Sequence, residues 1–462
     1  MSDKKPKNSI RMRIRKLIKS IPLDSPSIDQ AEQLINESKF DEALQIIEKF
    51  EKKKLTSSDQ FSCLFLKGTI MNKKGQFEEA IKLANHILQE ATEIENVIEI
   101  LDAIALRSEA LIRLGKLNES LEELIRGERI LKDRGSDQLE FVQREAALLN
   151  LKGLNYWLKG NFDQALGFFQ QCLVLRKKVG NKNEIASALN NLGITYTRKG
   201  DLDQGLTYFQ QALTLYKELG NTQNIARALN NLGNINMDIG DLDQALDYHQ
   251  QSLVLIRKLG NKQEIASSLN NIGWIYKLKG DFHLALEYSH RALTLKEEIK
   301  NLQQIAESLI NLSNIYLEKG ELDQALEYCQ RGLVLYEKVG NKQEIARSLH
   351  NIGEIYGQKG SLDQALEHFK QSLRLREEVG NNFHTAETLF HLVSVGMDKM
   401  TSEESQGYLD KLKEINEKEK NKVIRQRYRV AEALVLKKSA RARNRVKAEE
   451  LLEQVAGEDC RS

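Results

Sequence analysis

Histidine is the side chain in this sequence best suited to acid–base or metal chemistry, and the chain has eight of them. Two pairs, His283 with His290 and His384 with His391, are separated by seven residues. Two metal ligands on one helix are instead expected three or four residues apart, with a carboxylate close by. We therefore expect solvated or half-buried histidines and no metal. The full set is His86, His249, His283, His290, His350, His368, His384 and His391.

Other signatures of catalysis are missing from the sequence. It contains no GxxxxGK[ST], GxGxxG, HExxH or GxSxG motif. Acidic pairs such as Glu122-Glu123 are adjacent on a predicted helix and face different ways, which is typical of solvated charge. We predict a protein that is not an enzyme, needs no cofactor and takes no small-molecule substrate.

The cysteines and the apolar segments indicate the compartment. Cys63, Cys172, Cys329 and Cys460 are more than 100 residues apart and form no CxxC pair, which argues against a disulfide framework or a zinc module. No run of 18 apolar residues could form a transmembrane helix. The N-terminus lacks the apolar core of a signal peptide. These features predict a cytoplasmic protein.

The elements that would position any binding residue repeat with a period of 40 residues. In the unit at 181–220, Ile185, Leu189, Leu192 and Tyr196 are spaced as one face of a helix. A second helical pattern follows, and a Gly-Asp pair separates the two. Glycine suits a helix C-cap and aspartate an N-cap, so each unit predicts two antiparallel helices of roughly 17 residues. The unit glycines are Gly160, Gly200, Gly240, Gly280, Gly320 and Gly360.

Two columns of small residues indicate how the helices pack. One contains Gly153, Gly193, Gly233, Gly273 and Gly353, and the other contains Ala165, Gly205, Ala245, Ala285, Ala325 and Ala365. A glycine inside a helix costs about 1 kcal/mol relative to alanine. That cost is expected where another helix crosses too closely for a larger side chain. Because one hairpin cannot bury its own apolar face, stacked hairpins, and hence a solenoid, are predicted.

The repeat resembles the tetratricopeptide repeat (TPR). The residues that carry this resemblance in one unit are Leu192-Gly193, Tyr196, Gly205, Phe209 and Ala212. The 40-residue spacing and Gly-Asn linker resemble the LGN/Rapsyn and kinesin-light-chain branch of the family. The resemblance implies an all-α, right-handed superhelical solenoid of about eleven stacked antiparallel helix hairpins. The pattern is broken by Asn236, His249, Ser289, Lys300 and Ser313.

The repeat pattern divides the chain into four parts. Residues 1–26 form a basic arm, 27–140 degenerate TPR-like hairpins, 141–380 six regular units, and 381–462 degenerate hairpins with basic C-terminal helices. Coupling in such an array runs between neighbouring units. We expect the weakest joint near Lys300 and Ser313, where two glycines of the repeat are missing.

The resemblance also implies a binding surface, because the first helix of each hairpin lines the concave side in this family. Asparagine offers both a donor and an acceptor, so a column of asparagines can bond the main chain of an extended peptide. The alternative is that these amides bond water or a neighbouring helix. The two asparagine columns contain Asn191, Asn231, Asn271, Asn311 and Asn351, and Asn190, Asn230 and Asn270, the second continuing as Ile310 and His350.

Columns beside the asparagines vary from unit to unit, as expected for residues that select a partner. Trp274, Arg227 and Arg347 are the candidates here, because Trp and Arg are the usual anchors of interfaces. Packing between units is the alternative for Trp274. The predicted function is a protein-interaction scaffold or adaptor that binds a peptide or protein partner. A similar array forms the sensor half of bacterial peptide-pheromone receptors, but their helix-turn-helix domain is not evident here.

The charge distribution offers a second hypothesis. The net charge is +2, yet residues 1–22 carry eight basic and one acidic residue, and residues 420–447 eleven and one. Subtracting +7 and +10 from +2 leaves −15 for the rest of the chain. The basic ends could anchor a scaffold on an anionic membrane or a nucleic acid. A solvated arm is the alternative, and the acidic middle argues against an RNA-binding groove.

Overall fold

Helices are the regular elements that the structure contains. It is a computed structural model that describes residues 27–36, 39–53, 55–134, 138–397, 399–419, 421–438 and 442–459. Within these ranges there are 22 helices and no strand, and 22 is the number that eleven two-helix hairpins require. The predicted basic arm at 1–26 and Cys460 lie outside the described residues.

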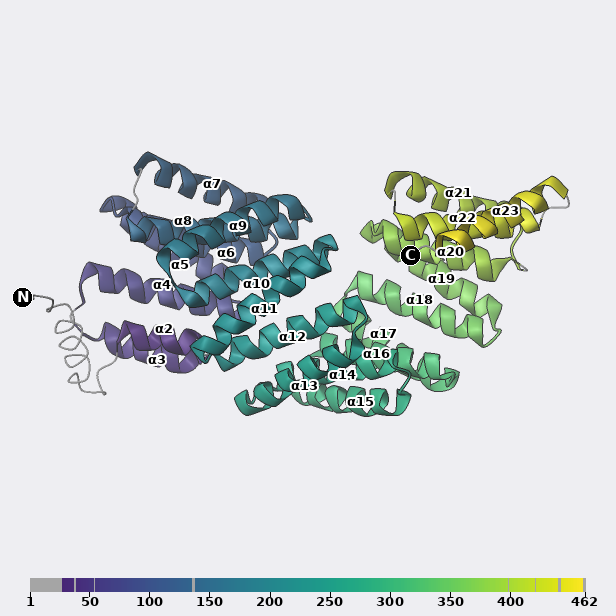
Figure 1. The fold of residues 1–462 in the computed structure, drawn as a ribbon, viewed down its shortest axis with the longest axis horizontal. Coiled ribbons are helices and arrows are strands. Elements are labelled where there is room, and N and C mark those ends of the chain that lie inside the picture. The colour runs from purple at the N-terminus through teal and green to yellow at the C-terminus, as the bar shows by residue number, and fades with distance from the viewer. Residues whose placement is uncertain are drawn as a thin grey trace, which may run out of the picture. The chain divides into compact units, whose positions relative to one another are not determined.

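The chain divides into two compact units, Met1–Ile239 and Gly240–Ser462 (Figure 1). The N-terminal unit contains α2 (Ile28–Asn36), α3 (Phe40–Glu51), α4 (Ser57–Lys74), α5 (Phe77–Glu93), α6 (Val97–Arg113), α7 (Leu117–Arg134), α8 (Leu139–Leu158), α9 (Phe162–Val179), α10 (Lys182–Lys199), α11 (Leu202–Leu219) and α12 (Thr222–Ile239). The C-terminal unit contains α13 (Leu242–Leu259), α14 (Lys262–Leu278), α15 (Phe282–Ile299), α16 (Leu302–Lys319), α17 (Leu322–Val339), α18 (Lys342–Gln358), α19 (Leu362–Val379), α20 (Asn382–Gly396), α21 (Ser402–Glu419), α22 (Lys422–Lys437) and α23 (Ala442–Asp459).

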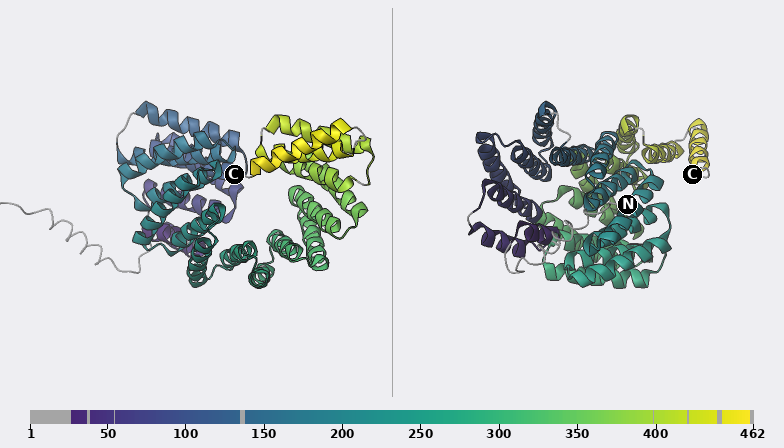
Figure 2. Two further views of the ribbon diagram at one scale, coloured as in Figure 1. Left: turned by 45° about the vertical axis from the view of Figure 1, so that its right-hand side comes forward. Right: turned by 60° about the vertical axis from the view of Figure 1, so that its left-hand side comes forward.

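Within each unit every helix packs on the next one along the chain, so the hairpins stack as a solenoid. Figure 2 shows this stacking in the C-terminal unit, from teal to yellow. The all-α fold of stacked hairpins is therefore confirmed. No helix in the part of the chain that is described is long and apolar enough to cross a membrane.

The predicted caps fix the ends of the helices. Gly200 ends α10 with a φ of 92°, in the left-handed region that glycine adopts without strain. Asp201 accepts a hydrogen bond from the Gln204 backbone over 3.1 Å and so caps α11. Asn221 accepts from the Asn224 backbone over 3.1 Å at the start of α12. Each turn therefore satisfies backbone donors that the helix itself leaves open.

The glycine column lets aromatic rings approach the first helices. A Cβ atom at Gly193 would lie 2.7 Å from Cδ1 of Phe209, and one at Gly353 would lie 2.8 Å from Cδ1 of Phe369. Both phenylalanines come from the second helix of the same hairpin and are buried. The close crossing predicted from the small residues is therefore real, and the neighbour in these units is an aromatic ring.

The structure accommodates the two missing glycines near the middle of the C-terminal unit. Lys300 takes the left-handed conformation of the linker glycine, with a φ of 61°. Ser313 is buried and its hydroxyl donates to the Ala325 carbonyl over 2.7 Å. The residue in the phenylalanine slot of this hairpin is the smaller Cys329. That this joint is the weakest stays a prediction.

The C-terminal hairpins pack although their repeat pattern fades. Leu389 of α20, Leu412 of α21 and Ile424 of α22 belong to one buried cluster that also contains Phe369 of α19. Helix α22 contacts both α20 and α21. The apolar core thus continues past the last regular repeat.

Candidate peptide groove

Asparagine pairs link the first helices of neighbouring hairpins in the N-terminal unit. The Asn191 amide Nδ2 donates to Asn150 Oδ1 over 2.9 Å, and the Asn231 Nδ2 donates to Asn190 Oδ1 over 2.7 Å. These four side chains are half-buried. In both pairs the two residues are 41 positions apart, one repeat plus one residue. A first helix therefore presents its amide to the first helix before it.

The amide pairs differ in the C-terminal unit. Asn270 Nδ2 donates to Ser308 Oγ over 3.4 Å, and Asn351 Nδ2 donates to Asn314 Oδ1 over 3.3 Å. The slot of Asn190 holds Ile310 in this unit, which is buried. Several amides thus bond a neighbouring helix, the alternative left open by the sequence. An asparagine side chain has two N–H donors and an oxygen with two lone pairs, so each of these asparagines can form further hydrogen bonds beyond the one described.

The first helices of the C-terminal unit line a polar cavity of about 310 Å³, which we call the first-helix groove. Both signs of charge meet in it: Lys277 Nζ lies 2.6 Å from Glu318 Oε1, and Arg376 Nη1 lies 3.4 Å from Glu387 Oε2. The lining consists of Lys277, Asn314, Leu317, Glu318, Arg347, Asn351, Glu354, Arg376, His384 and Glu387. These residues come from α14, α16, α18 and α20, with Arg376 from α19.

The three candidate selectivity residues differ in their surroundings. Trp274 is half-buried, with the Lys277 ammonium 3.9 Å from the centroid of its ring. Lys277 is itself buried, so this contact fixes the indole in place. Arg347 lines the first-helix groove, whereas Arg227 is exposed on α12 in the N-terminal unit. Asn271 and Asn311 are half-buried on α14 and α16, and Asn230 is half-buried on α12.

An ion network centred on Glu387 contributes Arg376, His384 and Glu387 to the lining of the groove. Glu387 Oε1 lies 2.8 Å from Arg427 Nη2, and its Oε2 lies 3.4 Å from Arg376 Nη1 and 3.3 Å from His384 Nδ1. Burial opposes ionisation of this carboxyl, yet Arg427 and Arg376 hold the pKa of Glu387 below its usual value. Arg427 also lies over the Phe383 ring. Part of the basic C-terminal stretch is thus engaged in packing.

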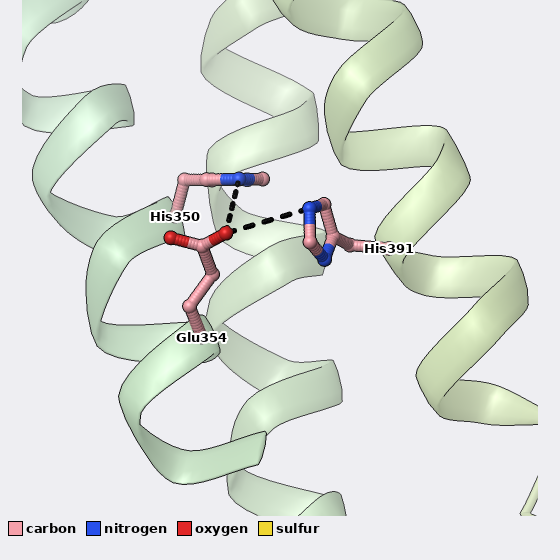
Figure 3. A group of neighbouring side chains, drawn as sticks. All are labelled: His350, Glu354 and His391. Carbon is pink, nitrogen blue, oxygen red and sulfur yellow. Dashed lines mark ion pairs between the residues drawn. The ribbon is translucent and has the colours of Figure 1, made fainter. Parts of the chain in front are cut away.

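Sequence reasoning missed a cluster beside this network. His350 and Glu354 are four residues apart on α18, and His391 of α20 joins them (Figure 3). Glu354 Oε1 lies 3.4 Å from His391 Nε2 and 3.8 Å from His350 Nε2. The His–Glu spacing was visible in the sequence, but only the register between hairpins brings in the third residue.

Burial dominates the electrostatics of this cluster. It lowers the pKa of His350 well below its ordinary value and also lowers the pKa of His391. Burial, assisted by Glu387, raises the pKa of Glu354 to about 7. Both imidazoles are therefore neutral at pH 7, and the carboxyl group is balanced between its two forms.

Stacked helical hairpins with a groove along their first helices define a helical-repeat interaction scaffold. Residues 266–462 match the MalT-like TPR region, and residues 144–218 and 224–298 match a tetratricopeptide repeat family. The chain is a tetratricopeptide-repeat protein. No curated protein matches it by sequence.

Solved structures show the same fold at low sequence identity. The apo form of RapI is 15% identical, with 86% of this chain and 99% of that chain covered and a TM-score of 0.59. The apo quorum sensor NprR from B. thuringiensis is 14% identical, with coverages of 78% and 99% and a TM-score of 0.56. Aspartyl phosphate phosphatase F from Bacillus subtilis is 15% identical, with coverages of 81% and 96% and a TM-score of 0.53.

Proposed function

We propose that this protein is a non-catalytic scaffold that holds a peptide segment of a partner protein in the first-helix groove. The observation that carries the proposal is the lining of that groove. Helices from four successive hairpins contribute amides and charges of both signs to one cavity. An extended peptide crosses several hairpins and meets such groups at a regular spacing.

Each set of residues has a role in this proposal. In the groove lining, Asn351 bonds the peptide main chain and Arg347 selects its side chains. Outside that lining but on the same first helices, Asn271 and Asn311 extend the main-chain contacts and Trp274 adds selectivity. Asn190, Asn191, Asn230, Asn231 and Arg227 offer the same chemistry on the N-terminal unit. NprR, one of the structures of similar fold, is named as a quorum sensor.

Two further features fit this function. The three cysteines within the described ranges, Cys63, Cys172 and Cys329, are buried free thiols, which suits the cytoplasmic location that we propose. The mixed charge of the groove suits a peptide better than a polyanion, because phosphate binding requires a surplus of Lys and Arg.

The test is a displayed peptide library selected on the immobilised full chain, followed by titration calorimetry with an enriched peptide. Arg347→Ala and Asn351→Ala should each weaken binding by about 0.5–1.5 kcal/mol per lost hydrogen bond, and Trp274→Ala by about 2 kcal/mol. Arg374→Ala, an exposed arginine on the second helix α19, is the matched control and should bind as the wild type does. Equal binding by all four variants would reject the groove as the site.

A further inference from the structure

The His350, Glu354 and His391 cluster combines two imidazoles with one carboxylate; His350 is buried and the other two side chains are half-buried. We propose that these three side chains bind one divalent transition metal ion, with Zn²⁺ as the representative of its class. Two nitrogen ligands and one oxygen ligand suit Zn²⁺ or Co²⁺, whereas Mg²⁺ and Ca²⁺ prefer oxygen ligands throughout.

The distances require only small side-chain movements. One ligand atom from each residue lies within 4.8 Å of the others, and Glu354 Oε1 is 3.4 Å and 3.8 Å from the two Nε2 atoms. With metal–ligand bonds of 2.0–2.1 Å, ligand atoms of a tetrahedral site lie about 3.3 Å apart. The glutamate–histidine contacts are close to that value, so binding mainly draws the two imidazoles together.

The repeat register explains why the two imidazoles meet. His350 occupies the slot of Asn190, and His391 occupies the slot of Asn231, again 41 residues apart. In the N-terminal unit the side chains in these two slots touch, because Asn231 Nδ2 lies 2.7 Å from Asn190 Oδ1. The same geometry places the His350 and His391 rings 4.9 Å apart between centroids. Glu354, one turn after His350, completes the set.

The hydrogen bonds around Thr388 orient His350 for metal binding. The Thr388 hydroxyl donates its one hydrogen to the His384 carbonyl over 3.2 Å and accepts from Arg376 Nη1 over 2.6 Å. The same hydroxyl lies 3.3 Å from His350 Nδ1 and can accept from an N–H at that nitrogen. In the tautomer that carries its hydrogen on Nδ1, the Nε2 lone pair is directed at the cluster. Metal-binding histidines are commonly held by such a second hydrogen bond.

The charged groups that face the cluster are two arginines and one glutamate, which together leave one positive charge. Arg376 and Arg427 are both positive, and both pair with Glu387, which His384 also contacts. A metal ion adds two positive charges, and the Glu354 carboxylate offsets part of that charge once its proton is displaced. Glu354 also lines the first-helix groove, so an ion can reach the site from solvent.

The test is titration calorimetry of the EDTA-treated, dialysed full chain with ZnCl₂, together with thermal melting with and without zinc. We expect one bound ion per chain and a higher Tm when zinc is present. Glu354→Gln keeps the shape of the side chain, and His391→Asn restores the residue type that the slot holds in α10 and α12. Each variant should lose at least tenfold in zinc affinity and the zinc-dependent rise in Tm.

His86→Ala is the matched control. His86 and Glu90 are also four residues apart, with 3.5 Å between Nε2 and Oε1. Both are exposed, and among the described residues they belong to no group of three possible metal ligands. This variant should bind zinc as the wild type does. The proposal is overturned if the wild type binds no zinc, if Glu354→Gln and His391→Asn bind it unchanged, or if His86→Ala abolishes the binding. Melting without zinc shows that each variant is folded.

Discussion

The first helices of the two units use one backbone frame for different chemistry. In α10 and α12 the contacting slots hold Asn190 and Asn231, whose amides form a neutral hydrogen bond. In α18 and α20 the same slots hold His350 and His391, beside a carboxylate and two arginines. The repeat thus determines which side chains meet, and the residue types determine what the contact does. A solenoid can place a different chemistry at each step without altering its frame.

The largest effect should follow from breaking the ion network around Glu387 in the C-terminal unit. Glu387→Gln leaves Arg376 and Arg427 without their shared counter-ion, and Arg376 is 4% exposed. Loss of one partner of a buried pair costs about 3–5 kcal/mol. Because the Glu387 side chain is 24% exposed, we expect a loss at the lower end of that range, to be measured by urea unfolding of each variant.

Glu184→Gln is the matched change in the N-terminal unit. Arg176 donates to the Glu184 backbone carbonyl, as Arg376 does to the His384 carbonyl. The Glu184 side chain, however, is 42% exposed, and its carboxylate lies 3.8 Å from Nε of Arg176. Because an exposed pair contributes at most about 1 kcal/mol, this substitution should change stability little. Equal losses in the two variants would contradict the contrast between the regions.

A second slot differs between α11 and α13 in its response to pH. Phe209 of α11 packs on Gly193 of α10. In α13 the equivalent slot holds His249, which is fully buried. Burial lowers the pKa of His249 to about 4 from an ordinary value of 6.5. Between these two values the unfolded chain binds the additional proton, so this residue costs stability as the pH falls from 6.5 toward 4.

His249→Phe should remove that loss. Its stability relative to wild type should rise as the pH is lowered through this window, by an amount of the order of 3 kcal/mol at the acid end. Urea unfolding of both proteins at several pH values between 4 and 7 measures the difference. Parallel pH profiles would mean that His249 does not titrate in this window.

The asparagine pair should contribute less than either of these groups. Asn231→Ala removes a half-buried neutral hydrogen bond to Asn190, worth about 1 kcal/mol of stability. The sequence left open whether these amides bond a peptide or a neighbouring helix, and the observed pairing favours a contribution to stability. A double-mutant cycle with Asn190→Ala isolates the coupling, and a coupling energy near zero would show that the amides act independently.

Local features of the fold were predictable because their causes lie within one repeat. The left-handed glycines, the Asp201 cap and the close approach at Gly193 follow from residues that are near in sequence. Contacts between repeats were not predictable in the same way. The His350–Glu354 spacing was legible, but His391 joins them only through the 41-residue register, and Arg427 was interpreted as part of a basic tail although it pairs with Glu387.

The smallest expected effect concerns the linkers. Lys300 and Gly220 end the second helices α15 and α11 with φ values of 61° and 66°, so one conformation carries two residue types. A non-glycine residue in this region is strained by about 1–2 kcal/mol, and the greater freedom of glycine in the unfolded chain returns about half of that. Lys300→Gly should therefore stabilise the protein by about 0.5 kcal/mol, and Gly220→Lys should destabilise it by a similar amount. Hydrogen exchange at the ends of α15 and α11 should report opposite changes in protection. If Lys300→Gly leaves exchange in α15 unaltered while Gly220→Lys loosens α11, the joint at Lys300 is limited by Ser313 and Cys329 and not by the linker.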